Sequence, residues 1–284
     1  MGRPYLVAAS AAVERALVGP TRPATVVAAT DSAVYFAVDD ERSTTICVAN
    51  TTAVRVPCAL VLGPDALVPR LAVGAVGAVG RGLVSANATA YRVSRWWRPP
   101  RVRPVVTDPR RLGAALTALT ELVADPLDAA GRAAAGPLVQ ALATGAPVRS
   151  AVARLLGRGP GLTPTGDDVL AAALVTLTAF APRAAASLAV PVTQAAPAAT
   201  TAVSAALLRH AARGECIPQL ADLVDAIVDG RDAGGLARAA GALLVVGHCS
   251  GAGMVHGVIL GLAVARRLTT PVHRPAAATL VGTA

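Results

Sequence analysis

Residues 157–168 have the sequence GRGPGLTPTGDD and run directly into the apolar helical stretch Val169–Ala179. Glycine lets the backbone N–H groups of a loop converge, and the first turn of a helix adds further N–H groups with a partial positive charge. The segment therefore predicts an anion-binding loop at a helix start. Arg158 could add a bidentate contact to a carboxylate or a phosphate.

The same residues also fit a capping box, which needs no substrate. In that register Thr165 is the N-cap and Asp168, at the third helical position, is a structural cap. Adjacent residues on a helix point about 100° apart, so Asp167 would be free to face a pocket. A stretch of twelve residues so rich in Gly, Thr and Asp exceeds what a cap requires, which favours a binding site over a purely structural role.

A second candidate segment is LLVVGHCSGAG at 243–253, an apolar run that breaks into a Gly-rich turn and enters another helix. His248 and Ser250 lie at this turn, where a helix N-terminus favours a neutral imidazole or a bound anion. The alternative for His248 is a core histidine with its hydrogen bonds satisfied. Cys249 is expected to be a small buried side chain. Because both segments are Gly-rich helix entries, we expect them to converge on one pocket.

The third segment is TTAVSAALLRHAARGE at 200–215. Thr200 and Ser204 are one helical turn apart and form a stripe of hydroxyl groups. These hydroxyls either bond back to their own helix or line a pocket, and both interpretations stay open. Glu215, after Gly214, is expected to be a solvated charge at a helix end.

The chain as a whole predicts an α+β fold, with a small N-terminal β-rich domain followed by a mainly α-helical domain. Short β-prone runs separated by Asp, Asn, Gly and Pro extend from Ala24 to about Val93. The triplet repeat of Ala, Val and Gly at 72–80 predicts a strand or loop with small side chains. The low aromatic content, 2%, predicts a core built from Ala, Val and Leu.

Proline and apolar spacing predict the boundaries. Residues 1–97 form the β-rich domain, and the Pro- and Arg-rich residues 98–107 form a linker. The helical domain extends over 108–268 and contains the predicted site, and 269–284 form a tail.

Composition limits the function classes. A net charge of +9 could indicate a nucleic-acid partner, but all 26 basic residues are arginine, and we expect the arginines around Trp96 and Trp97 to be solvated. Four cysteines without a CxxC spacing predict neither a zinc clip nor a disulfide framework, and favour the cytoplasm. The uncharged stretch Gly241–Ala265 is interrupted by glycines and histidines, so no membrane span is expected.

The motifs GRGPGLTPTGDDVLAA (157–172), TTAVSAALLRHAARGE (200–215) and LLVVGHCSGAGMVHGVILGL (243–262) together resemble the AllH-like family. That family, long catalogued as a domain of unknown function, is associated with oxamate carbamoyltransferase as one of its subunits. The resemblance implies a part in carbamoyl transfer between carbamoyl phosphate and oxamate or a similar amide acid, alongside larger partner subunits. In one departure, Gly253 stands where the family usually has an acidic residue.

Carbamoyl transfer needs a held phosphate and a polarised carbonyl. The candidate catalytic residues are Asp167 and His248. The candidate substrate-binding residues are Arg158, Gly159, Gly161, Thr163, Thr165, Gly166, Thr200, Ser204, Ser250 and Gly251. Two alternatives remain: a non-catalytic small-molecule-binding or assembly subunit, and a basic nucleic-acid-binding protein. A divalent metal ion is a candidate cofactor, but the sequence identifies neither its ligands nor the substrate.

Overall fold

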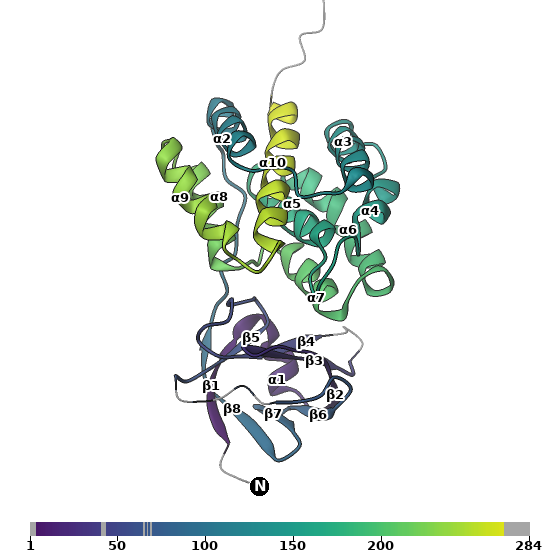
Figure 1. Ribbon diagram of the computed structural model, residues 1–284, viewed down its shortest axis with the longest axis vertical. Helices are drawn as coiled ribbons and strands as arrows, with labels where there is room; N and C mark the ends of the chain where they lie inside the picture. Colours follow the sequence, from purple (N-terminus) through teal and green to yellow (C-terminus); the bar gives the residue numbers. More distant parts are fainter. Residues whose placement is uncertain (1–3, 41–43, 65, 67, 69, 270–284) are drawn as a thin grey trace, which may run out of the picture.

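The computed structural model describes residues 4–40, 44–64, 66, 68 and 70–269 (Figure 1). Its first part contains the strands β1 (Tyr5–Ser10), β2 (Arg22–Ala29), β3 (Ala33–Val38), β4 (Thr45–Ala49), β5 (Ala59–Leu62), β6 (Val76–Gly80), β7 (Leu83–Ala86) and β8 (Thr89–Trp97), with η1 (Ala11–Val13) and α1 (Glu14–Val18) between β1 and β2. The helices that follow are α2 (Pro109–Leu122), α3 (Ala129–Thr144), α4 (Arg149–Leu155), α5 (Thr165–Phe180), α6 (Pro182–Ala199), α7 (Ala202–Ala211), α8 (Pro218–Val228), α9 (Ala233–Leu244) and α10 (Ser250–Thr269).

The strands close into a barrel in the order β1-β5-β4-β3-β2-β6-β7-β8. Strand β1 completes the circle because it pairs with β5 on one side and, in parallel, with β8 on the other. The predicted fold class, a small β-rich domain beside a helical one, is therefore wrong for the N-terminal part, which is a closed barrel of eight strands in the described residues.

Two segments account for the difference. Residues of the Ala-Val-Gly repeat form β6, which pairs with both β2 and β7. Strand β8 continues to Trp97, past the run that ends at Val93 in the sequence-based prediction, and so it is long enough to pair with β7 and β1. Closure depends on pairing between strands far apart in the chain, which local alternation of apolar residues does not reveal.

The barrel interior contains aromatic side chains despite their scarcity. Phe36 and Tyr91 are completely buried, and Ile46 and Leu60 are buried with them. The prediction of a core built from Ala, Val and Leu is thus incomplete here. Closing the barrel leaves no free sheet edge, which an isolated β-rich domain would otherwise have to protect.

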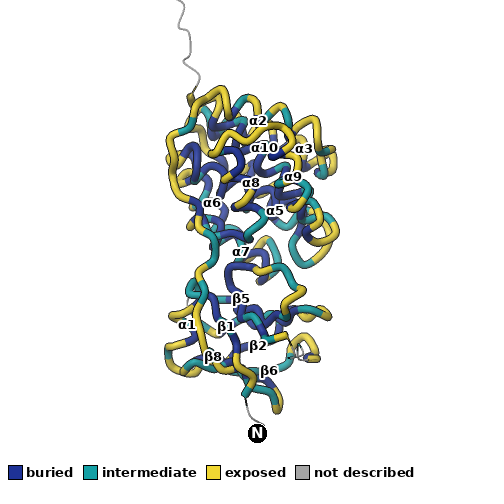
Figure 2. Tube along the Cα trace, turned by 90° about the vertical axis from the view of Figure 1, so that its left-hand side faces the viewer, coloured by how far each residue is buried: buried dark blue, intermediate teal, exposed yellow. Residues whose placement is uncertain are grey.

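Helix α5 forms the centre of the helical part, where nearly all of its residues are buried (Figure 2). An apolar helix that is covered on every side belongs to a core. Helix α10 is long and apolar enough to cross a membrane by length and composition alone. It packs instead against α5, α2, α3 and α9, as a core helix does.

Glycines set the distance between α5 and α10. Gly253, Gly257 and Gly261 recur every four residues on one face of α10. A Cβ added at Gly257 would lie 2.3 Å from the carbonyl oxygen of Val169, and one at Gly261 would lie 2.7 Å from Cβ of Thr176. The two backbones therefore pack closer than any larger residue would allow.

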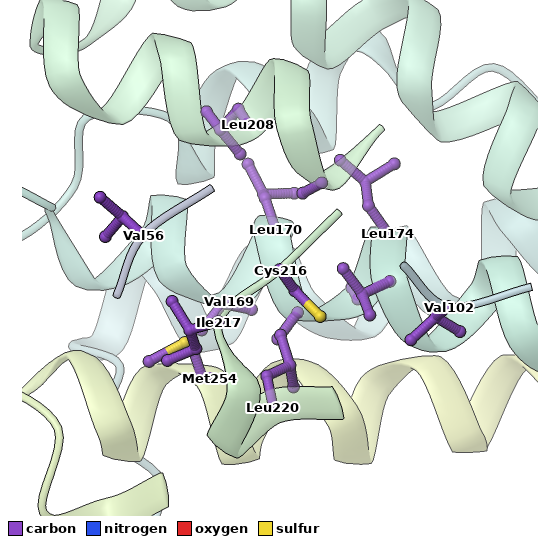
Figure 3. Close-up of a cluster of buried hydrophobic side chains, with 14 of the residues drawn as sticks. Val56, Val102, Val169, Leu170, Leu174, Leu208, Cys216, Ile217, Leu220 and Met254 are labelled. Carbon is purple, nitrogen blue, oxygen red and sulfur yellow. The ribbon is translucent and has the colours of Figure 1, made fainter. Parts of the chain in front are cut away.

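The segment 98–107, which connects the barrel to α2, runs along the helical part as an extended strap. The N–H of Val102 donates to the carbonyl of Gly214, the N–H of Cys216 donates to that of Pro100, and the N–H of Val105 donates to that of Ala179. Val102 and the barrel residue Val56 both join the apolar cluster around Leu170 and Leu208 (Figure 3). The division of the chain into domains at 98–107 stays a prediction. The predicted tail at 269–284 lies outside the described residues, except for Thr269, which ends α10.

The glycine stripe leads to a stability prediction. Gly257→Ala should destabilise the protein by about 1–3 kcal/mol, because the added methyl group meets backbone and cannot be relieved by a side-chain rotation. Gly241→Ala in α9 is the matched control: its Cβ points into open space, so we expect a gain of about 0.5–1 kcal/mol. Urea unfolding measures both, and equal effects of the two variants would show that α10 does not depend on close packing.

Candidate active site at the joint start of helices α5 and α10

The Gly-rich loop and the second turn lie side by side, as the sequence predicts. The hydroxyls of Thr163 and Ser250 are 2.8 Å apart and share a hydrogen bond. The Thr165 hydroxyl faces the thiol of Cys249 at 3.7 Å. The first turns of α5 and α10 therefore begin at one place on the molecule, brought together by the glycine contacts described above.

Helix α5 does not use the predicted capping box. Pro164 occupies the N-cap position, Thr165 is already helical, and no side chain caps the helix. The carbonyl of Pro164 accepts the N–H groups of Asp167 and Asp168, and the carbonyl of Arg158 accepts that of Gly166. The roles predicted for Thr165 as N-cap and Asp168 as structural cap are wrong, because extended Pro164 moves the helix start by one residue.

Asp167 is the carboxylate that holds the loop in place. It is 1% exposed. Its Oδ1 accepts the N–H of Gly157 at 2.8 Å, and its Oδ2 accepts the hydroxyls of Thr200 and Ser204, the latter at 2.7 Å. Three donors from two segments satisfy this buried group. Asp167 therefore does not face a pocket as the capping register predicted, and its geometry is that of a structural tie.

Asp168 has the opposite environment. It is buried beside Thr163 and Ser250, and its Oδ2 has no hydrogen-bond partner. Burial, together with the negative charge of Asp167, raises the pKa of Asp168 to about 8, although the two hydroxyls oppose the shift. At pH 7 the carboxyl is mostly protonated and can donate a hydrogen bond. A neutral buried acid with an unpartnered oxygen marks a candidate functional site.

Gly253, at which the resemblance implied an acidic residue, packs against Asp168. A Cβ added at Gly253 would lie 3.0 Å from Cβ of Asp168. A side chain at this position would therefore meet Asp168.

The outer residues of the two segments are exposed. Gly159 and Gly161 lie on the surface of the loop, and Gly247 and His248 lie on the surface of the turn. The N–H of Gly251, which the sequence proposed as a substrate contact, donates to the carbonyl of Val246. These four residues are thus the exposed part of the two segments whose inner residues surround the buried Asp168.

The predicted hydroxyl stripe turns inward. Thr200 and Ser204 both donate to Asp167, so they neither bond back to their own helix nor line an open pocket. The neighbouring Thr201 caps α7 by accepting the N–H of Ser204 and donates its hydroxyl to the carbonyl of Leu162. The sequence analysis did not identify Thr201, although a threonine just before an apolar helical run is a cap signal.

Arg158 has a partner within the chain. Its guanidinium contacts Asp128 at 2.6 Å in an ion pair that is partly exposed on both sides. The N–H of Gly131 and then Arg158 hold the pKa of Asp128 below its usual range. Exposed ion pairs contribute little to stability, so an incoming anion could compete for Arg158.

Glu215 is not the solvated charge that its position suggested. It lies 2.7 Å from Nδ1 of the buried His210 and 3.1 Å from Arg213. Burial acts to raise the pKa of Glu215, but the hydrogen bond from His210 and the charge of Arg213 outweigh it and lower that pKa. No group of three His, Cys, Asp or Glu side chains gathers within the described ranges, so none of them forms a ready metal site.

A known protein family matches the part of the chain that contains these residues. Residues 155–262 match the family described as oxamate carbamoyltransferase subunit AllH. The resemblance expected from the three motifs is confirmed. The AllH match includes the loop, α5, α7 and most of α10, and it leaves the barrel and the strap outside. No curated protein and no solved structure matches the chain.

The contacts of Asp167 lead to a prediction. Asp167→Asn should destabilise the protein by about 1–3 kcal/mol, because an amide N–H₂ would then face a donor that has no other acceptor. The matched control is Asp222→Asn on the exposed side of α8, where a change within about 0.5 kcal/mol is expected. Both are measured by urea unfolding. If Asp167→Asn had the same free energy of unfolding as the wild type, the Asp167 carboxylate would not be what holds the loop to the helices.

Proposed function

We propose that this chain is a subunit of a carbamoyltransferase-type enzyme and that its working site lies around Asp168. The observation that carries the proposal is the buried, unpartnered Oδ2 of Asp168 at the joint start of α5 and α10, inside the segment that matches AllH. The family name describes a subunit, which supports a complex with other carbamoyltransferase subunits. The proposal includes a cytoplasmic location for the protein.

Carbamoyl transfer forms a bond between a nucleophilic nitrogen and the carbonyl carbon of carbamoyl phosphate. The bond from that carbon to the phosphate oxygen breaks, phosphate leaves, and the nitrogen gives up a proton. Negative charge develops on the carbonyl oxygen during this step, and a fixed donor lowers the barrier. Protonated Asp168 would supply such a donor, or would hold the amide acid in the same way.

The phosphate or carboxylate of the substrate would lie outside Asp168, towards the exposed loop. Gly159 and Gly161 are exposed there, and no atom lies within 4 Å of the position that a Cβ of Gly161 would take. Arg158 would exchange its ion pair with Asp128 for the anion. His248 would face the same space from the turn. We therefore keep Arg158, Gly159, Gly161, Thr163, Ser250 and His248 as substrate-side residues, and we assign Asp167, Thr200 and Ser204 to support of the loop.

A non-catalytic binding or assembly subunit is the second candidate. It is favoured by the number of site groups already engaged within the chain. The N–H groups of Gly166, Asp167 and Asp168 have backbone acceptors, and the Asp167 carboxylate has three donors. The chain would then hold a ligand or shape a site whose reacting groups come from a partner subunit.

The role of Asp168 as a donor can be tested with two substitutions. Oxamate and carbamoyl phosphate are added separately, and the melting temperature of the isolated chain is recorded, since a ligand that binds the folded state raises it. Asp168→Leu should lose the rise because it has no donor. Asp168→Asn should keep most of it, because the amide still donates a hydrogen bond.

A rise that survives in Asp168→Leu would place the ligand elsewhere. A loss in both variants would mean that the ionised carboxylate is needed, against the donor role. With partner subunits present, Asp168→Leu should also lower the carbamoyl-transfer rate. An unchanged rate in an intact complex would favour the assembly subunit.

A further inference from the structure

A cavity of about 790 Å³ lies between the barrel and α7, away from Asp168. Residues from η1, α1 and the start of β2 form one wall, and the C-terminal half of α7 forms another. In Figure 1, α7 is the helix next to the barrel strands. The Thr45 hydroxyl on β4 joins the two sides by donating to the carbonyl of Ala202 at 3.3 Å.

Four arginines are among the residues that line this cavity, which we call the arginine cavity. Arg15 and Arg22 enter from the barrel side, and Arg209 and Arg213 enter from α7 and the turn after it. Asp40 is the acidic residue that lines the cavity among those described, and it accepts the N–H of Thr44 at 2.8 Å. Among the residues that the structure describes, the lining therefore carries more positive than negative charges.

The neighbouring groups reduce this charge without cancelling it. Glu215 pairs with Arg213 and also with His210, which lines the cavity too. Burial and then the nearby Arg213 lower the pKa of Arg209, whereas Asp40 opposes that shift. Arg15 and Arg22 are exposed at the barrel side. Cations converging on one concave space are a typical setting for an anion, which relieves their mutual repulsion.

We propose that the arginine cavity binds a small metabolite that carries a phosphate or a carboxylate group. Its volume falls in the range of small-molecule sites, about 300–1,000 Å³. The guanidinium fork matches the paired oxygens of both anions, and several forks around one space hold more than one charged group.

The arginine cavity is distinct from the candidate site at Asp168, and the proposal does not depend on the carbamoyltransferase function. Helix α7 touches both places. Ser204, in its first turn, donates to Asp167, and Arg209, more than one turn later, lines the cavity. An anion held here would therefore lie between the barrel and the helix that supports the Gly-rich loop.

The test is isothermal titration of the full chain with two probes, pyrophosphate for the phosphate arm and oxalate for the carboxylate arm. The variant is the double substitution Arg15→Gln with Arg22→Gln, at two exposed positions. The matched control is Arg183→Gln with Arg238→Gln, on the exposed faces of α6 and α9, which removes the same charge from outside the cavity.

We expect wild-type protein to bind at least one probe and the Arg15/Arg22 variant to bind it at least about ten-fold more weakly, since each lost charge-assisted hydrogen bond has about that effect. The Arg183/Arg238 control should bind as the wild type does, and Asp168→Leu should keep the part of the binding that the Arg15/Arg22 variant loses. No binding of either probe, or an equal loss in the control, would overturn the proposal. A loss confined to Asp168→Leu would assign the anion to the other site and would also overturn it.

Discussion

The close approach of α5 and α10 is the contact on which the site depends. Glycines at 253, 257 and 261 let the two helices pack backbone to backbone, and so their first turns begin together. Thr163 and Ser250 can then share a hydrogen bond, and Asp168 becomes enclosed by residues from both segments. A larger residue on this face of α10 would separate the two turns and let water reach the carboxyl.

Two adjacent carboxyls acquire different roles because they point into different surroundings. Asp167 meets three donors that join the loop, α5 and the start of α7. Asp168 meets apolar packing, two hydroxyls and the charge of its neighbour, and burial keeps it protonated at neutral pH. Asp167 thus helps to set the protonation state of Asp168, as often happens when two titratable groups lie close together.

Local signals in the sequence predicted that the two Gly-rich segments meet, but not what each side chain does there. The Gly-rich loop and the 247–253 turn could be recognised because glycines followed by a helix start form a pattern of consecutive residues. Which aspartate ties the loop depends on Thr200 and Ser204, more than thirty residues away along the chain. Barrel closure depends likewise on β1 meeting β8. The arginine cavity combines residues of the barrel and of α7, and no single segment predicts it.

The protonation of Asp168 is tested most directly by the pH dependence of stability. Its folded-state pKa is raised from 3.8 to about 8, so the folded protein keeps a proton that the unfolded chain releases. The stability that this proton contributes is complete below pH 3.8 and is lost as the pH rises to about 8. Urea unfolding of the wild type and of Asp168→Asn across this window should show the wild type losing stability relative to the variant, with no further loss above it. A difference that stays constant from acid to alkaline pH would contradict the account, because Asp168 would then ionise in the folded protein as it does in water.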